Sequence, residues 1–166
     1  MFWCILLHMR KRKHRKTYQV AANPVMYAIM GATVIDEDSL DQLRSGELMA
    51  MEAFRTGAAT VQDWKLVSEF CNLAESMAQD GIGPEAMPAV KLAQQALIEA
   101  HERFVRTGQM GTSGPGLTAF RDAYQYHDLQ RQSVARSVYE KHIERVLNKI
   151  RSKSPDVLFV NPKGTK

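Results

Sequence analysis

Apolar side chains recur at every third or fourth position through most of this 166-residue chain, and this spacing limits what the chain can fold into. One stripe runs through residues 40–54 and a second through residues 64–78. A period of this kind places apolar side chains along one face of an α-helix. Only the short apolar run at residues 156–160 could dock as an added strand, or else stay exposed. The pattern therefore predicts an all-α chain.

Glycines and capping residues divide the stripes into separate helices. Thr60 and Asp63 have the spacing of a capping box at a helix start, as do Ser137 and Glu140. Residues 108–116 hold four glycines and a proline, which indicates a loop. The helices expected from these signals are Pro24 to about Met30, and residues 40–55, 61–79, 85–107, 117–135 and 138–151.

The predicted fold is an antiparallel bundle of four or five helices, with the short N-terminal helix lying across it. We expect the bundle domain to cover residues 24–152. A basic, disordered arm precedes it at residues 1–23, and a loose tail follows at residues 153–166.

Two residues of the first long helix do not fit its pattern. Glu47 interrupts an otherwise apolar stripe. Gly46 lies in the helix interior, where glycine costs about 1 kcal/mol relative to alanine. Gly46 indicates either close packing or a weak point.

The charge of the chain is divided unevenly. The net charge of +4 hides an acidic body, because residues 17–140 carry nine Lys/Arg against sixteen Asp/Glu. Both ends are basic: residues 10–16 carry six positive charges, and residues 141–166 carry seven Lys/Arg against two Asp/Glu. The alkaline isoelectric point therefore belongs to the ends and does not indicate a basic domain.

The first eight residues are mostly apolar but too few to cross a membrane. They also lack the order of a signal peptide, because the basic cluster follows the apolar run. We favour Met9 as the true start of the chain. The other interpretation is a weak membrane-surface anchor, formed by the apolar tip and the basic patch.

The basic arm is the strongest functional signal in the sequence. Its charged side chains are Arg10, Lys11, Arg12, Lys13, Arg15 and Lys16. Such a run binds polyanions with a salt-sensitive affinity that does not depend on base sequence. No aromatic side chain is interleaved to stack on bases. The arm could equally be a solubilising tail.

An unusual polar stretch lies in the helix predicted from residue 117. Its candidate partner-binding residues are Arg121, Tyr124, His127, Asp128 and Arg131. Several of them share one helical face, which suits a polar binding surface or a proton-transfer pair of His127 with a carboxylate. The alternative is an ordinary helix with packed aromatics and surface ion pairs. No nucleophile, oxyanion donor or cofactor motif accompanies His127, so we predict no catalytic site.

Metal and cofactor binding find no support in the sequence. The five histidines are scattered without metal-ligand spacing. The glycine-rich loop at residues 108–116 lacks the lysine of a phosphate-binding loop. Cys4 and Cys71 do not form a disulfide framework, which favours a reducing compartment, and we predict a cytoplasmic location.

Several short motifs resemble those of an uncharacterised family of small helical proteins from phages and plasmids of proteobacteria. The motifs include the basic start at residues 9–14, Gly81–Pro84, Gly114–Gly116 and Tyr126–Ser133. The resemblance covers the chain from Met9 to about Ser152. It implies a mobile-element setting and carries over no functional residue.

Three functional hypotheses follow. The first is a non-enzymatic accessory protein of a mobile element that binds nucleic acid non-specifically through its basic arm. In this hypothesis the helical bundle forms a homodimer or holds a protein partner. The second is a protein-binding module that engages a host factor through its acidic helical body. The third, an enzyme, requires Tyr124, His127, Asp128 and Arg131 to face one cleft.

Overall fold

The computed structural model describes Val25, Ile29 and residues 31–158, and over these residues it contains helices and no strand. The all-α expectation is therefore confirmed. The helices with defined bounds are α2 (Glu37–Thr56), α3 (Val61–Gln79), α4 (Met87–Thr107), α5 (Gly114–Ser133) and α6 (Arg136–Arg151), and a 3-10 turn at Pro84–Ala86 leads into α4. The basic arm lies outside the described residues, as does most of the helix predicted from Pro24. None of the described helices is long and apolar enough to cross a membrane.

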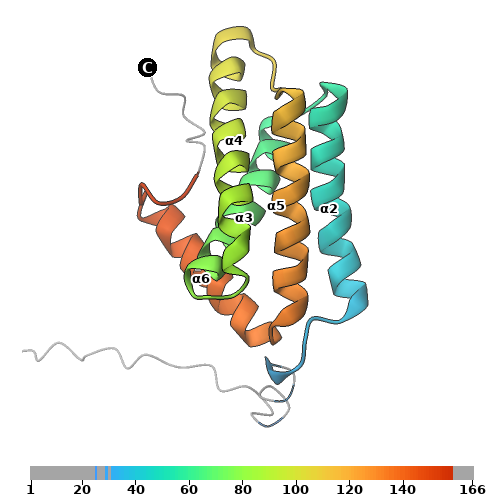
Figure 1. The fold of residues 1–166 in the computed structure, drawn as a ribbon, viewed down its shortest axis with the longest axis vertical. Coiled ribbons are helices and arrows are strands. Elements are labelled where there is room, and N and C mark those ends of the chain that lie inside the picture. The colour runs from blue at the N-terminus through green and yellow to red at the C-terminus, as the bar shows by residue number, and fades with distance from the viewer. Residues whose placement is uncertain (1–24, 26–28, 30, 159–166) are drawn as a thin grey trace, which may run out of the picture.

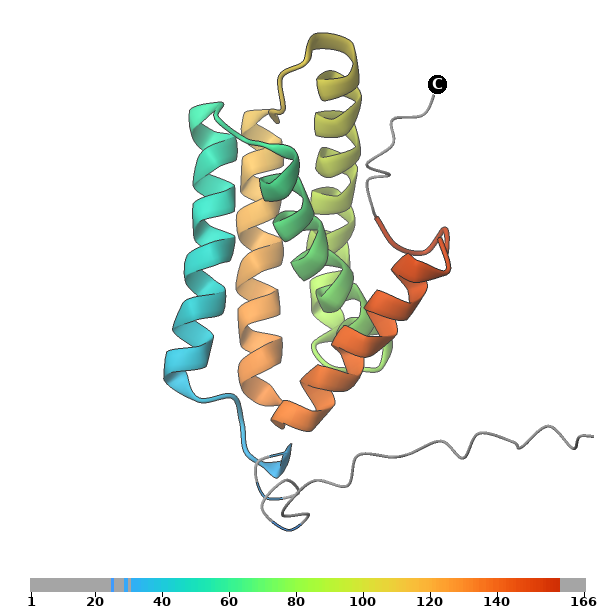
Figure 2. The ribbon, with the colours of Figure 1, turned by 180° about the vertical axis from the view of Figure 1, so that it is seen from behind.

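Helix α3 is the centre of the fold. In Figure 1, α2, α5 and α4 stand side by side with α3 behind them. Seen from behind, α3 runs obliquely across these helices, and α6 diverges from the lower end of α5 (Figure 2). Helix α3 packs against α2, α4, α5 and α6. Four of its fully buried side chains, Val67, Phe70, Cys71 and Ala74, form the middle of the main apolar core.

The helix starts follow the capping chemistry more closely than the apolar periods. The capping box predicted for Thr60 and Asp63 is confirmed, with the Asp63 carboxylate 2.7 Å from the Thr60 amide. The predicted start of α2 at Leu40 is three residues late, because the Asp36 carboxylate caps the amide of Ser39 at 2.9 Å. Acidic residues after the cap then occupy the first turn, where the helix dipole favours them.

The start of α5 at residue 117 was also predicted too late. Ser113 caps the helix by accepting from the Gly116 amide, and Pro115 lies within the first turn. Proline is tolerated there because its missing N–H would have no partner in the helix. Gly114, Pro115 and Gly116 are therefore helical, whereas Gly108 ends α4 and Gly111 lies in the predicted loop.

The predicted break near Ala135 is confirmed, because Val134 and Ala135 are extended between α5 and α6. The predicted restart at Val138 is wrong. Helix α6 begins at Arg136, and no side chain caps it. The Arg136 amide instead donates 2.8 Å to the Thr33 carbonyl, so the chain before α2 holds the start of α6.

The chain after α6 folds back onto α3 as far as it is described. The buried Asn72 side chain donates to the Leu158 carbonyl at 2.9 Å and accepts from the Leu158 amide at 3.2 Å. Val157 is buried beside it. This part of the apolar run at residues 156–160 is attached through its backbone, without forming a strand.

Candidate functional site

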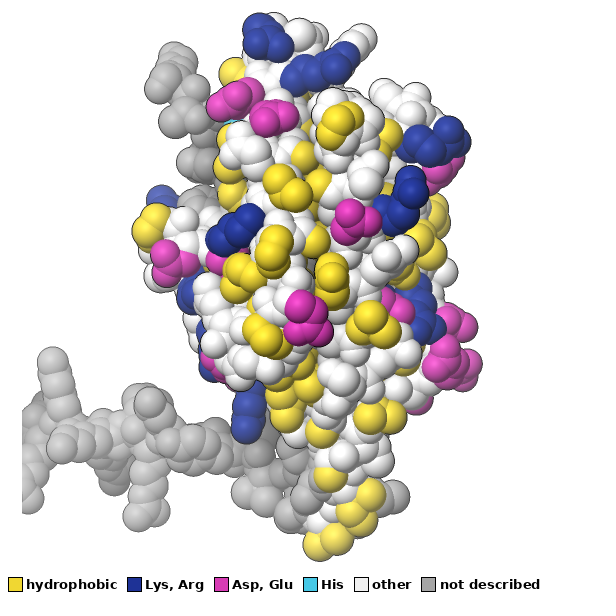
Figure 3. All heavy atoms as spheres, in the orientation of Figure 1, with side chains coloured by type: hydrophobic (Ala, Val, Ile, Leu, Met, Phe, Trp, Pro, Cys, Tyr) yellow, Lys and Arg dark blue, Asp and Glu magenta, His cyan; other side chains and the backbone are white. Residues whose placement is uncertain are grey.

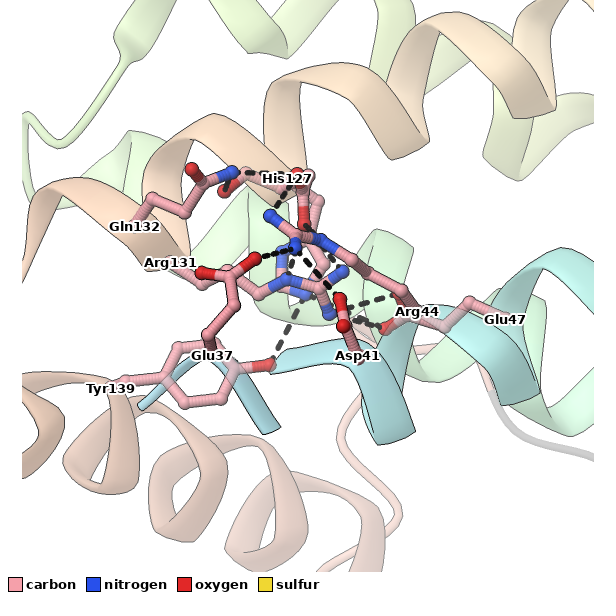
Figure 4. A network of polar contacts seen from close by, with 9 residues as sticks. Glu37, Asp41, Arg44, Glu47, His127, Arg131, Gln132 and Tyr139 are labelled. Atoms are coloured by element: carbon pink, nitrogen blue, oxygen red, sulfur yellow. Dashed lines mark hydrogen bonds and ion pairs between the residues drawn. The ribbon is translucent and has the colours of Figure 1, made fainter. Parts of the chain in front are cut away.

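A buried ion network joins α2 to α5, and Arg131 is its centre (Figure 4). The Arg131 side chain is fully buried. Its Nη1 lies 3.0 Å from Glu47 Oε1, and its Nε donates 2.8 Å to Asp128 Oδ1. A buried guanidinium needs opposite charge beside it, because desolvation is costly. The glutamate that interrupts the apolar stripe of α2 supplies that charge from the facing helix.

Arg44 extends this network to the surface. Its Nε and Nη2 donate to the two oxygens of Asp128 at 3.0 and 3.1 Å, the paired geometry that suits a guanidinium and a carboxylate. Its Nη1 also contacts Glu37 at 2.7 Å and Asp41 at 3.1 Å. Hydrogen bonds from Arg44 and Arg131 lower the pKa of Asp128, although burial alone would raise it. The network is thus fully buried at Arg131 and exposed to solvent at Glu37.

Two titratable groups around Arg131 have pKa values shifted from their usual ones. Burial raises the pKa of Glu47 to about 7, against the opposing charge of Arg131. Burial lowers the pKa of His127 to about 3, and the charge of Arg131 adds to this effect. His127 is therefore neutral near pH 7. Its Nε2 lies 3.2 Å from the Tyr139 hydroxyl, and its ring stacks on Phe70.

The residues predicted to bind a partner do not form one surface. His127 and Arg131 are fully buried, so neither side chain can reach a partner in this structure. Tyr124 is half-buried, and with Arg121 it lines a groove between α5 and α2. Since the four polar side chains do not face one cleft, the geometry required for the enzyme hypothesis is not met. In the described residues, the polar stretch of α5 mainly joins helices.

A second buried histidine has a structural partner as well. Ser76 Oγ lies 2.9 Å from His142 Nδ1, and Asp80 lies 3.8 Å from Nε2. Ser76 and His142 are both about 3% exposed. A serine this deeply buried between α3 and α6 cannot meet a substrate carbonyl, so the three side chains are best explained as a joint between the two helices.

An apolar groove opens between α2, α3 and α6, with a volume of about 390 Å³. Its walls are Gln42, Leu43, Gly46 and Glu47 of α2, Leu66, Glu69, Phe70 and Leu73 of α3, and Tyr139, Ile143, Val146, Leu147 and Ile150 of α6. A second depression of about 340 Å³ shares Leu43 and Tyr139 with it and continues toward the start of α6. The two together form one elongated groove, which we call the α2–α6 groove.

The outer face of α4 and α5 has a different character. Figure 3 shows its apolar side chains interspersed with charged ones. Leu92 and Leu129 are each 64% exposed there. Scattered apolar side chains of this kind are normal on a protein surface, whereas a continuous apolar groove indicates a binding site.

Sequence reasoning missed the α2–α6 groove. Glu47 and Gly46 were recognised as irregular, and both line it. Helix α6 presents Tyr139, Ile143 and Ile150 to the groove. The one sequence signal for the groove was the apolar face of α6. The sequence could not show which helix, if any, packs against that face.

The described residues hold no group of three His, Cys, Asp or Glu side chains placed to bind a metal ion. Cys71 is buried, and burial raises the pKa of its thiol. The basic residues 10–16 lie outside the described part of the chain. Comparison with protein-family models, with curated proteins and with solved structures finds no match to this chain.

Proposed function

We propose that this chain is a non-enzymatic protein-binding module, and that the α2–α6 groove receives a helix of a partner protein. The observation that carries the proposal is the groove itself. Leu43 and Leu147 stand on opposite walls and are about 40% exposed, although both belong to apolar stripes. A partner that covered them would remove this apolar surface from water.

The shape of the groove suits a helix. From Arg136 to Ile150 along α6, its length is about 21 Å at the helical rise per residue. The wall residues of α6 and α3 recur at three- and four-residue spacing, so each wall is itself a helical ridge. An amphipathic helix packs its own ridge between two such walls, as in other helix-in-groove complexes.

The buried network supports the proposal because it fixes both walls. Glu47 of α2 is bound to Arg131 of α5, and Tyr139 of α6 contacts His127 of α5. Both Glu47 and Tyr139 also line the groove. A groove with walls held in this way loses little conformational entropy when a ligand enters.

The test is affinity purification from host lysate, with and without nuclease, using three forms of the full chain. Leu147→Asp places a charge in the groove, and Leu92→Asp is the matched control on the outer face of α4. We expect a protein that the wild type and Leu92→Asp both recover, that Leu147→Asp loses, and that nuclease does not remove. Equal recovery by the two variants would contradict the proposal.

Nucleic-acid binding through the basic arm is a second candidate function, and the six charges at residues 10–16 favour it. It would suit an accessory protein of a phage or plasmid acting in the cytoplasm, a setting that stays a prediction. We expect weak binding to duplex DNA or RNA whose affinity falls steeply with salt. Replacing all six Lys/Arg by glutamine should abolish that binding, and binding that survived the replacement would remove this candidate.

A further inference from the structure

One carboxylate of the α2–α6 groove, Glu69, has no ion-pair partner within the part of the chain that the structure describes. Among the groups lining its main part, only Glu47 and Glu69 are charged. Glu47 is bound to Arg131 at 2.9 Å. Glu69 is exposed, and within the described residues it forms no ion pair. Partial burial against the apolar walls raises the pKa of Glu69, and the charge of Lys65 one turn away opposes this only in part.

The other carboxylates that line the groove and its continuation are already paired. Arg136 pairs with Glu140 at 2.9 Å in the depression that continues the groove. Glu37 and Asp41 of α2 pair with Arg44. A positive charge brought in by a ligand would therefore find Glu69 as its free counter-ion.

Gly46 supplies a second, independent observation. A Cβ built at this position meets nothing within 4 Å, so packing within the described residues gives no reason for a glycine. Glycine is a poor helix former, yet α2 continues through it. Gly46 also lines the groove, where the missing side chain lowers the α2 wall. A helix backbone can approach most closely at such a notch.

We propose that the helix received by the groove is basic, crosses α2 at Gly46, and places a lysine or arginine beside Glu69. This inference rests on the proposed function and adds the chemistry of the partner. Of the three helices that form the groove, α2 and α3 carry net negative charge and would attract such a helix, whereas α6 carries net positive charge.

Three labelled probe peptides of about 18 residues test the charge preference. They share one leucine stripe and differ in their polar face, which is lysine, glutamine or glutamate. Fluorescence anisotropy with the full chain should give at least tenfold tighter binding for the lysine probe than for the glutamate probe, with glutamine between them. Equal affinities would overturn the inference and leave the proposed function standing. No binding by any probe, together with equal recovery by Leu147→Asp and Leu92→Asp, would overturn both.

A variant pair tests the role of Glu69. Glu69→Gln should weaken the lysine probe about fivefold and leave the glutamine probe unchanged, because only the lysine probe forms the ion pair. Glu99→Gln, an exposed glutamate on α4, is the matched control and should change neither. A loss shared by both probes, or by the Glu99 variant, would overturn the assignment to Glu69.

Gly46→Ala tests the crossing point without risk to the fold. The variant should melt at a higher temperature than the wild type, since alanine favours the helix and the space is open. It should nevertheless bind the lysine probe more weakly, by about tenfold, because the new methyl group occupies the notch. Unchanged or tighter binding by a more stable variant would exclude the crossing at Gly46.

Discussion

The two sides of helix α2 have opposite characters although they meet at one residue. Toward α5, Glu47, Arg131 and Asp128 form a chain of alternating charges, in which the buried Arg131 is paired with both carboxylates. Toward α6, Leu43 and Leu147 line the open α2–α6 groove and are each about 40% exposed. The first side holds the fold together from within. The second side, toward α6, is apolar like a protein core, but no helix of the described chain covers it.

This contrast separates groups that serve folding from groups that serve binding. A polar side chain singled out in sequence, such as His127, proves to be internal, whereas ordinary leucines form the open groove. Substitutions on the α5 side should therefore change stability, and substitutions on the α6 side should change binding. Four predictions sharpen this comparison.

Arg131→Met should have the largest effect on the fold. Removing the guanidinium leaves Glu47 and Asp128 without their shared partner in a buried site. Breaking one member of a buried ion network typically costs about 3–5 kcal/mol. Urea unfolding measures the loss, and a change below about 1 kcal/mol would mean that the network is not structural.

Glu47 should make stability depend on pH. Its pKa is about 7 in the folded chain and 4.5 in the unfolded one, so the folded state binds a proton more tightly. Its contribution is therefore fully present below about pH 4.5 and is lost as the pH rises to about 7. The difference in unfolding free energy between wild type and Glu47→Gln should fall across this window by about 3 kcal/mol.

The measurement for Glu47 is a series of urea titrations of both proteins from pH 4.5 to 7.5. Taking the difference removes His127, whose lowered pKa gives the opposite slope, with stability rising between about pH 3 and 6.5. A difference that stayed constant with pH would contradict a buried, proton-binding Glu47.

Gly46→Ala should stabilise the fold by about 1 kcal/mol, because the position is helical and its Cβ would meet nothing. Chemical unfolding of the wild type and the variant gives the value directly. Destabilisation would show that α2 needs the glycine for its own packing, and would remove the reason to assign it to a partner.

Leu147→Asp should have the smallest effect on the fold, below about 1 kcal/mol, because the leucine is already 41% exposed. A thermal melt beside that of Leu92→Asp checks this expectation. A loss as large as that of Arg131→Met would mean that the groove wall is part of the core.

The sequence predicted much of the fold because local signals agreed with one another. The stripe and capping box of α3 gave its bounds as observed, Val61–Gln79. Ends were less certain where Pro and Gly in the first turn of α5 looked like loop residues, or where α6 began through a backbone contact to Thr33 instead of a cap.

The candidate site could be predicted only in part. Glu47 and Gly46 are visible as exceptions to a helical pattern, but their neighbours depend on how α6 crosses α3. No local rule gives that angle, since α6 follows two extended residues, Val134 and Ala135. The sequence also could not separate an exposed polar face from an internal one, so Arg131 and His127 were assigned to a surface.

Heteronuclear NMR of the full chain, titrated with the lysine probe peptide, tests the central claim most directly. We predict that amide shifts change along the facing sides of α2, α3 and α6, around Leu43, Glu69 and Ile143, and stay constant around Leu92 on α4. Shifts confined to the outer face of α4 and α5, or no shifts at saturating peptide, would contradict the account.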